Sequence, residues 1–265
     1  MEKINKRAQL TIFIIIAILI VAFVALFFSF RNGIQKEKSA SPETAEIQNF
    51  VEECIYDVGE DALYFIGLHG GYYLPPRFST SLGIPYYIKE NKTLMPTKEN
   101  IEVEISKYVD EALLLCSGNF KSSQAAEKFP GNFTEFDNFK ITSGEVKTSA
   151  KIFDEKVILN VNYPLTIIRE EEKSRISKFE TDIPVRLGII YNASSFIVSE
   201  HLKNTGEICM SCLLELQEKE NLSIMSQDSS EESNTIIYNL FDETYLFKEK
   251  IPETEKYLFR FAVEY

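Results

Sequence analysis

Histidine, the commonest catalytic acid–base residue, is scarce in this chain: only His69 and His201 occur among 265 residues. The sequence also lacks an HExxH zinc motif, a Gly-x-Ser-x-Gly nucleophile elbow and a phosphate-binding loop. His69 stands beside Gly70 and Gly71, a setting more typical of a loop residue than of a catalytic base. We therefore expect no catalysis, no bound metal and no cofactor.

Positive charge is in short supply as well. The chain has 28 Lys and Arg against 40 Asp and Glu, and beyond residue 38 the balance is 22 against 38, a net charge of −16. Nucleic acids require a basic surface to neutralise their phosphates. The composition thus excludes nucleic acid as a partner.

Charge is absent altogether from residues 8–30, where Gln9, Thr11 and Ser29 are the only polar side chains. A helix of this length spans a hydrocarbon core of about 30 Å. A buried core helix would have a polar face, and a secretory signal peptide would have a shorter apolar core followed by a small-residue cleavage site. The run predicts a transmembrane helix over residues 9–30, after a basic cytoplasmic leader at 1–8.

The flanking basic residues do not set the orientation, because three precede the helix and three follow it within residues 1–38. The acidic remainder and four N-x-S/T glycosylation sequons favour a location outside the cytoplasm. The sequon asparagines are Asn91, Asn132, Asn192 and Asn221. We predict a single-pass protein of the cell membrane, in contact with the lipid bilayer and with its C-terminal domain outside.

The run Lys6-Arg7-Ala8-Gln9-Leu10-Thr11-Ile12-Phe13, which leads into the apolar helix, resembles the class III signal peptide of archaeal type IV pilin-like proteins. The resemblance implies cleavage by a prepilin peptidase between Ala8 and Gln9, with the helix kept on the mature protein. Pilins that polymerise usually carry a Glu at the position of Phe13, where it neutralises a neighbour's amine. With Phe13 in place of that Glu, the resemblance implies a minor, tip-like or merely membrane-held relative of the pilins, with other pilin-like or surface proteins as possible partners.

Most of the remaining length resembles an uncharacterised group of archaeal single-span proteins, which brings no known activity. The similarity is carried by seven blocks: 50–54, 70–72, 84–87, 108–116, 161–165, 184–188 and 259–263. It implies one anchored ectodomain.

Two amphipathic helices are expected early in that ectodomain, after a linker at residues 31–44 that is either polar coil or a solvated helix extension. Apolar residues from Ile47 to Ile66 recur at i, i+3 and i+4, and Gly70-Gly71 ends the pattern. A second helix starts near Thr97 and continues to Cys116. We expect the two helices to pack face to face in a helical subdomain of residues 45–137.

Residues 138–265 predict an α+β subdomain, because the apolar period changes to two. The expected strands are 145–153, 156–169, 174–187, 235–241 and 257–265, the expected helices are 187–202 and 208–217, and 226–233 is expected to be an exposed loop. We expect one mainly antiparallel sheet that includes both residues 145–187 and the C-terminal strand.

The four cysteines of an external domain indicate two disulfides. Cys54 and Cys116 lie on the apolar stripes of the two early helices, so we predict that their Cα atoms lie within about 7 Å. Cys209 and Cys212 form a CxxC that could be a structural bridge, half of a metal site or a redox dithiol. No thioredoxin-like pattern surrounds the pair and no spacing recommends further zinc ligands, which favours the structural bridge.

Four tyrosines flank a proline-rich loop and could form a recognition surface, although ordinary packing of the loop explains them equally well. They are Tyr72, Tyr73, Tyr86 and Tyr87. The sequence as a whole predicts an anchored surface protein that acts by binding or assembly. The alternative is an extracytoplasmic thiol–disulfide oxidoreductase that uses Cys209 and Cys212.

Overall fold

A computed structural model describes residues 42–118, 140–203, 208–246 and 256–265. The sequence-predicted transmembrane helix 9–30, the Ala8–Gln9 cleavage site and the Asn132 sequon lie outside these residues. Among the helices that the structure describes, none is both long enough and apolar enough to cross a membrane. Residues Glu46–Tyr265 form one compact unit, to which the description below applies.

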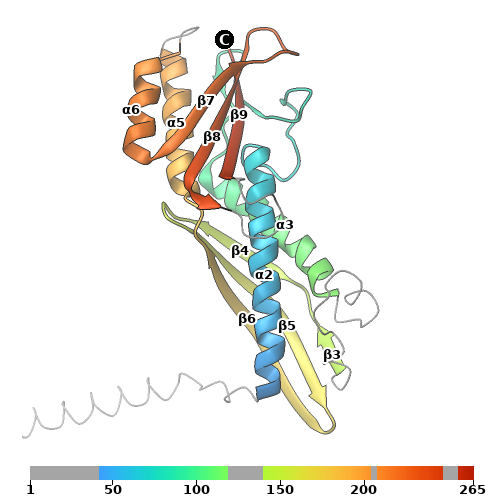
Figure 1. Ribbon diagram of the computed structural model, residues 1–265. Coiled ribbons are helices and arrows are strands. Elements are labelled where there is room, and N and C mark those ends of the chain that lie inside the picture. Colours follow the sequence, from blue (N-terminus) through green and yellow to red (C-terminus); the bar gives the residue numbers. More distant parts are fainter. Residues whose placement is uncertain (1–41, 119–139, 204–207, 247–255) are drawn as a thin grey trace, which may run out of the picture. The chain divides into compact units, whose positions relative to one another are not determined.

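The described residues form four helices and nine strands (Figure 1). The helices are α2 (Pro42–Leu68), α3 (Lys98–Cys116), α5 (Leu187–Lys203) and α6 (Met210–Glu220). The strands are β1 (Tyr86–Lys89), β2 (Lys92–Thr93), β3 (Lys140–Ser143), β4 (Lys147–Ile152), β5 (Val157–Arg169), β6 (Glu172–Ile183), β7 (Leu222–Asp228), β8 (Thr235–Leu246) and β9 (Lys256–Glu264). An α+β class with mainly antiparallel strands is confirmed.

The strands are divided between two sheets, so the expectation of a single sheet is wrong. One sheet has the order β2-β1-β9-β8-β7, with only β1 and β9 parallel. In the other, β3 and β4 pair with successive parts of one side of β5, and β6 pairs with its other side. The C-terminal strand β9 pairs with β8 along one edge and with β1 along the other. Neither edge of β9 is therefore free to pair with the strands of residues 145–187.

Several boundaries also differ from the sequence-based expectation. Strand β6 ends at Ile183 rather than Leu187, because Pro184 has no backbone N–H for a ladder and Leu187 already begins α5. Strand β7 continues to Asp228, inside the segment expected to be a loop. The short strands β1, β2 and β3 and the early part of β7 were not expected, because such short runs have little periodicity.

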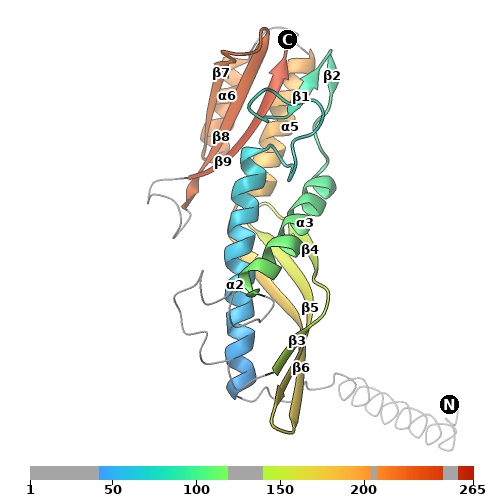
Figure 2. The ribbon, with the colours of Figure 1, turned by 90° about the vertical axis from the view of Figure 1, so that its right-hand side faces the viewer.

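Helix α2 packs against both sheets, as Figure 2 shows from the side. A Cβ atom on Gly59 would lie 2.5 Å from Ile183 and 2.6 Å from Leu159, in the four-stranded sheet. A Cβ atom on Gly67, two turns later, would lie 2.4 Å from the carbonyl oxygen of Leu258 in β9. The two glycines therefore permit one helix to approach both sheets closely.

Helix α3 covers the outer edge of β4. The backbone N–H groups of Thr148, Ala150 and Ile152 point away from β5 and donate to side chains of α3. Their acceptors are Asp110, Ser106 and Glu102, at distances of 2.7, 3.0 and 3.0 Å respectively. The three acceptors are four residues apart and so share one face of α3, and the three donors alternate along β4 and so share one edge of the strand. Each acceptor therefore lies opposite one donor. The helix thus closes an edge that could otherwise pair with another chain.

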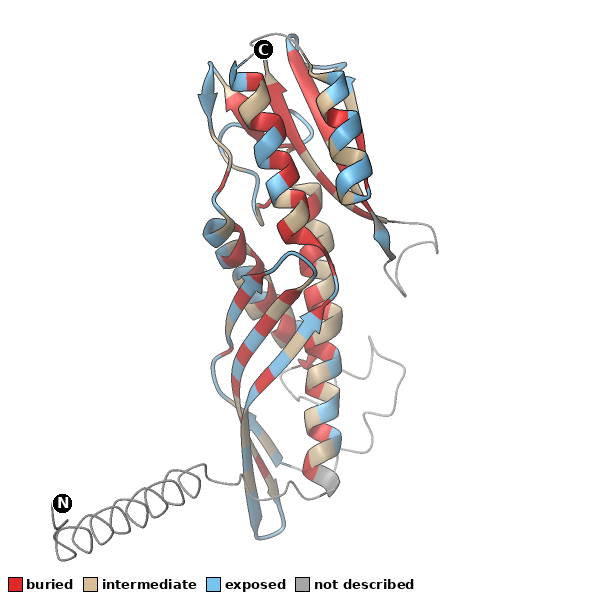
Figure 3. Ribbon diagram, turned by 90° about the vertical axis from the view of Figure 1, so that its left-hand side faces the viewer, coloured by how far each residue is buried: buried red, intermediate tan, exposed pale blue. Residues whose placement is uncertain are grey.

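The five-stranded sheet is packed on both faces. Tyr238 and Phe261 stack on one face, which belongs to the main core beneath α5. Ile237 and Ala262, one residue along their strands, point to the opposite face, where they pack with Ile84 and Tyr86. Figure 3 shows α5 and α6 in front of this sheet, with buried residues on the sides that face it.

Candidate functional site

A groove of about 580 Å³ lies between α5, α6 and the turn that joins β4 to β5. Helix α5 comes close to this turn at its first residues, where the N–H of Gly188 donates a hydrogen bond to the carbonyl oxygen of Phe153 at 3.2 Å. A Cβ atom at Gly188 would lie 2.5 Å from that carbonyl oxygen. Apolar side chains line the groove, namely Ile189, Ala193, Phe196 and Leu216.

The rim of the groove is acidic. Asp154 and Glu155 of the turn and Glu215 and Glu220 of α6 line it, together with Lys219. Lys219 lies 2.6 Å from Glu220, and this hydrogen bond raises the pKa of the Lys219 ammonium. The other three carboxylates have no ion-pair partner among the described residues. Lys219 also attracts Glu215 electrostatically, but one ammonium does not balance four carboxylates, so the groove carries an excess of negative charge beside its apolar side chains.

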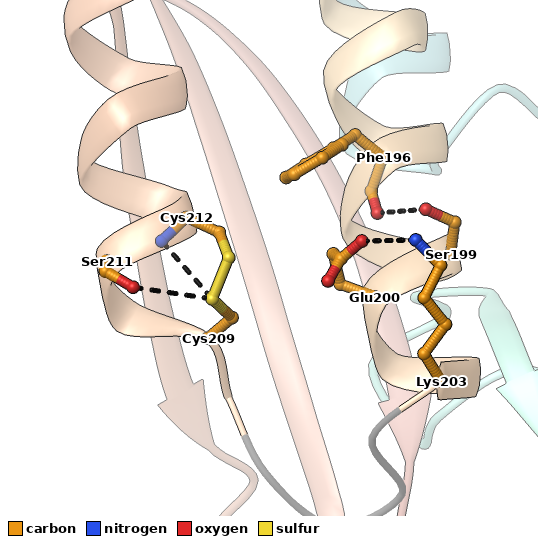
Figure 4. The surroundings of a disulfide bond; sticks show 7 residues. All are labelled: Phe196, Ser199, Glu200, Lys203, Cys209, Ser211 and Cys212. Carbon is orange, nitrogen blue, oxygen red and sulfur yellow. Dashed lines mark hydrogen bonds and ion pairs between the residues drawn. A yellow bond between two sulfur atoms is a disulfide. The ribbon is translucent and has the colours of Figure 1, made fainter.

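A disulfide between Cys209 and Cys212 stands at one end of the groove (Figure 4). Cys209 is the N-cap residue of α6, and its Sγ accepts a hydrogen bond from the N–H of Cys212 at 3.4 Å. Cys212 itself lines the groove, and Phe196 of α5 extends toward it. Both sulfurs are engaged in the disulfide, and no group of three or more potential metal ligands occurs within the described residues.

The second disulfide joins Cys54 of α2 to Cys116 of α3, with the Cα atoms 5.8 Å apart. This confirms the predicted pairing. Both cysteines are buried. The two bridges therefore differ in their exposure to solvent, since Cys209 and Cys212 are only half-buried.

His201 lies behind the CxxC disulfide, where both groups border a small cavity. Its Nε2 atom is 2.5 Å from the hydroxyl of Tyr238, and burial lowers the pKa of the imidazole and raises that of the phenol. The histidine is thus neutral at pH 7 and joins the end of α5 to β8.

A buried ion pair that sequence reasoning missed holds the same region together. Arg186 donates to the carboxylate of Asp242 at 2.6 Å and to the carbonyl oxygens of Glu220 and Asn221 at 2.9 and 3.0 Å. Burial raises the pKa of Asp242, but the hydrogen bonds from Arg186 and Thr244 outweigh it and lower the pKa overall. The arginine connects the start of α5, the end of α6 and β8.

The four tyrosines proposed as a recognition surface lie mostly within the fold. Tyr86 and Tyr87 are buried, and the Tyr87 hydroxyl donates to the carbonyl of Gly70 at 2.8 Å. Tyr73 donates to Glu111, and Tyr72 is half-buried. The same loop instead exposes three large apolar side chains, of Leu74, Phe78 and Leu82. In the sequence, the exposure of these side chains is indicated only by the neighbouring Pro75-Pro76, because two prolines favour an extended backbone outside helices and central strands.

Three of the four glycosylation sequons fall on exposed residues. Asn91 lies in a tight turn with φ at 59°, and Asn221 caps the C-terminus of α6. Asn192 lies on α5 and lines the groove. A glycan at this position would occupy the groove.

No family model matches the sequence, and no curated protein or solved structure matches it either.

Proposed function

We propose that this chain is a single-pass membrane protein whose ectodomain lies outside the cytoplasm and acts by binding or assembly, in the manner of a pilin-like surface protein. The uncharged run 9–30 supports the anchor, and the motif around Ala8 and Gln9 supports a pilin-like N-terminus. The two disulfides are consistent with an oxidising compartment.

The observation that carries the binding role is the groove between α5 and α6. Binding sites are typically concave and apolar, with a few polar groups that orient the ligand. Here an apolar floor with a partly exposed Phe196 lies beneath the carboxylates of Asp154, Glu155 and Glu215. This arrangement favours ligands that combine an apolar group with positive charge.

Fractionation of native membranes, followed by N-terminal sequencing, tests the anchor and its processing. We expect the chain in the membrane fraction with Gln9 as its first residue. Arg7→Ala together with Ala8→Leu should block cleavage while leaving the chain in the membrane. A membrane-bound chain that begins at Met1 would refute processing alone, and a chain found in the soluble fraction would refute the anchor.

Replacement of Phe13 by Glu tests the pilin-like part of the proposal. Glu at this position can neutralise the amine of a neighbouring mature chain inside an apolar bundle, where an unpaired charge is costly. We expect Phe13→Glu to increase incorporation into filaments, with Phe13→Gln as the uncharged control. Equal incorporation of both variants and the wild type would contradict the charge argument.

Thiol–disulfide exchange at Cys209 and Cys212 is a second candidate. The favouring observation is the N-cap position of Cys209, since amide groups at a helix N-terminus stabilise a thiolate. In this reaction one thiolate of a protein dithiol attacks the disulfide, forms a mixed disulfide and releases a cysteine thiolate. The second substrate thiolate then breaks the mixed disulfide, so two electrons pass from the substrate to the CxxC.

Oxidation of reduced, unfolded ribonuclease by the full chain tests this candidate. We expect equimolar protein to convert ribonuclease thiols to disulfides while Cys209 and Cys212 become reduced and the buried Cys54–Cys116 bridge stays intact. The matched control is the Cys209→Ala, Cys212→Ala variant. Equal rates for the two proteins would eliminate the redox candidate and leave the bridge as a structural clamp on α6.

A further inference from the structure

The loop between α2 and β1 presents an apolar surface that nothing in the described structure covers. We call residues Leu74–Leu82 the docking loop. Leu74 is 71% exposed, Phe78 42% and Leu82 60%, so three large apolar side chains face solvent within nine residues. Isolated exposed apolar residues are ordinary, but three large ones within one short loop make that loop a candidate interaction site.

The backbone of the docking loop is held in place from several sides. The carbonyl of Phe78 accepts from the N–H of Tyr86 at 3.0 Å, and the Ser79 hydroxyl donates to the carbonyl of Pro76 at 2.8 Å. The N–H of Ser81 donates to Glu232 in the β7–β8 turn at 2.7 Å. A fixed loop loses little conformational entropy on binding, which favours its use as a docking element.

Charge links this loop to the groove. Arg77, in the middle of the docking loop, is exposed, and its guanidinium carbon lies 5.6 Å from the centre of the Phe78 ring. It has no carboxylate partner among the described residues. The loop thus offers aromatic and aliphatic side chains beside a cation. The groove offers apolar side chains together with an excess of carboxylates, among them Asp154, Glu155 and Glu215.

The loop and the groove of one molecule cannot meet, because they lie on opposite faces of the five-stranded sheet. Ile84 and Tyr86, at the end of the loop, pack on the face that carries Ile237 and Ala262. On the other face, His201 of α5 contacts Tyr238 (Figure 1). A docking loop can therefore enter only the groove of another molecule.

We propose that the docking loop of one copy binds in the groove of a second copy, with Phe78 on the apolar floor and Arg77 at the acidic rim. This inference rests on the binding or assembly function proposed above and names the partner as the chain itself. Because the two surfaces differ, a pair still has one free groove, on the copy that gave its loop, and one free loop, on the copy that gave its groove, so the contact can propagate. The contact is small and weak in solution, but tethering to one membrane raises the effective concentration of the copies.

Photo-crosslinking of the full-length chain in lipid vesicles tests the contact. A benzophenone amino acid replaces Leu74 in one sample and Leu115 in the other. Leu115 is a matched control because it is also 71% exposed but lies on α3. Mixing labelled with unlabelled chains identifies crosslinks between copies by mass spectrometry. We expect the Leu74 position to crosslink to residues 187–220 of another copy, with at least about ten times the yield of Leu115.

A charge exchange makes the test specific. Arg77→Glu should reduce the yield about fivefold, and Glu215→Arg in the partner copy should restore it. Equal crosslinking from Leu74 and Leu115, crosslinks to other segments, or no rescue would overturn the inference. So would a glycan found on Asn192 of the native protein, because it would fill the groove.

These results can be separated from a failure of the anchored function. The same crosslinking is repeated on the native fraction that contains the chain, membrane or soluble, so that its readout does not depend on the anchor. Recovery in the soluble fraction with loop-to-groove crosslinks would refute the anchor and leave the self-association intact. Recovery in the membrane without such crosslinks would leave the anchor intact and refute the self-association.

Discussion

The two disulfides should contribute very different amounts to stability, because they close loops of very different length. Cys54 and Cys116 are 62 positions apart, whereas Cys209 and Cys212 are 3 apart. On the chain-entropy estimate, the long bridge stabilises the fold by about 4 kcal/mol and the short one by about 2 kcal/mol. Burial of Cys54 and Cys116 increases the difference, since their replacement by alanine also leaves a small cavity.

Urea unfolding of two double-alanine variants measures this difference. For an m-value of about 2.5 kcal/mol/M, we expect a fall in midpoint of about 1.5 M without the long bridge and of less than about 1 M without the short one. The m-values must agree with that of the wild type for the comparison to hold. Equal falls, or a larger fall without the Cys209–Cys212 bridge, would refute the argument from loop length.

Three further substitutions, the last with a matched control, test the packing of the fold. Asp242→Asn should cost about 3 kcal/mol at pH 7 by leaving Arg186 without its buried partner. Because the pKa of Asp242 is lowered in the fold, the wild type should lose this advantage as the pH falls below about 4, so the two unfolding curves should converge there. The wild type should lose stability as the pH falls below about 6.5, because burial lowers the pKa of His201 and its protonation favours the unfolded chain. His201→Phe should not show this loss, because phenylalanine does not titrate. Gly67→Ala should destabilise the protein by about 2 kcal/mol, because its Cβ would meet a β9 carbonyl oxygen at 2.4 Å, whereas Gly144→Ala, at 3.4 Å from its nearest neighbour, should cost less in the same urea assay.

The first two described helices were predictable because their signal is local. Apolar residues at i, i+3 and i+4 predicted helices from Ile47 to Ile66 and from Thr97 to Cys116, and the structure has Pro42–Leu68 and Lys98–Cys116. The same pattern placed two cysteines on facing stripes, which made the Cys54–Cys116 bridge a prediction that the structure confirms.

The candidate site was only partly predictable. The CxxC was visible as a motif, and Asn192 as a sequon. The groove, however, depends on Phe196, Leu216 and Asp154, which come from three separate elements. Tyr86 and Tyr87, two of the four tyrosines suggested as a recognition surface, are buried, because aromatic type alone does not show which residues a strand will bury.

The sequence by itself therefore determined the class of the fold, the periodic helices, most of the longer strands and the two disulfides. The helices and strands follow from patterns within short windows, and the Cys54–Cys116 pairing follows from two such patterns. Only the tertiary structure decided the division into two sheets. Strand β9 pairs with β8 and with β1, whose Tyr86 is 176 positions before its partner Ala262 (262 − 86), through backbone hydrogen bonds that carry no side-chain signature. The same holds for the pair of Arg186 and Asp242, which are 56 residues apart. Long-range pairing depends on which surfaces remain available after the local elements have formed, and a single sequence does not record that outcome.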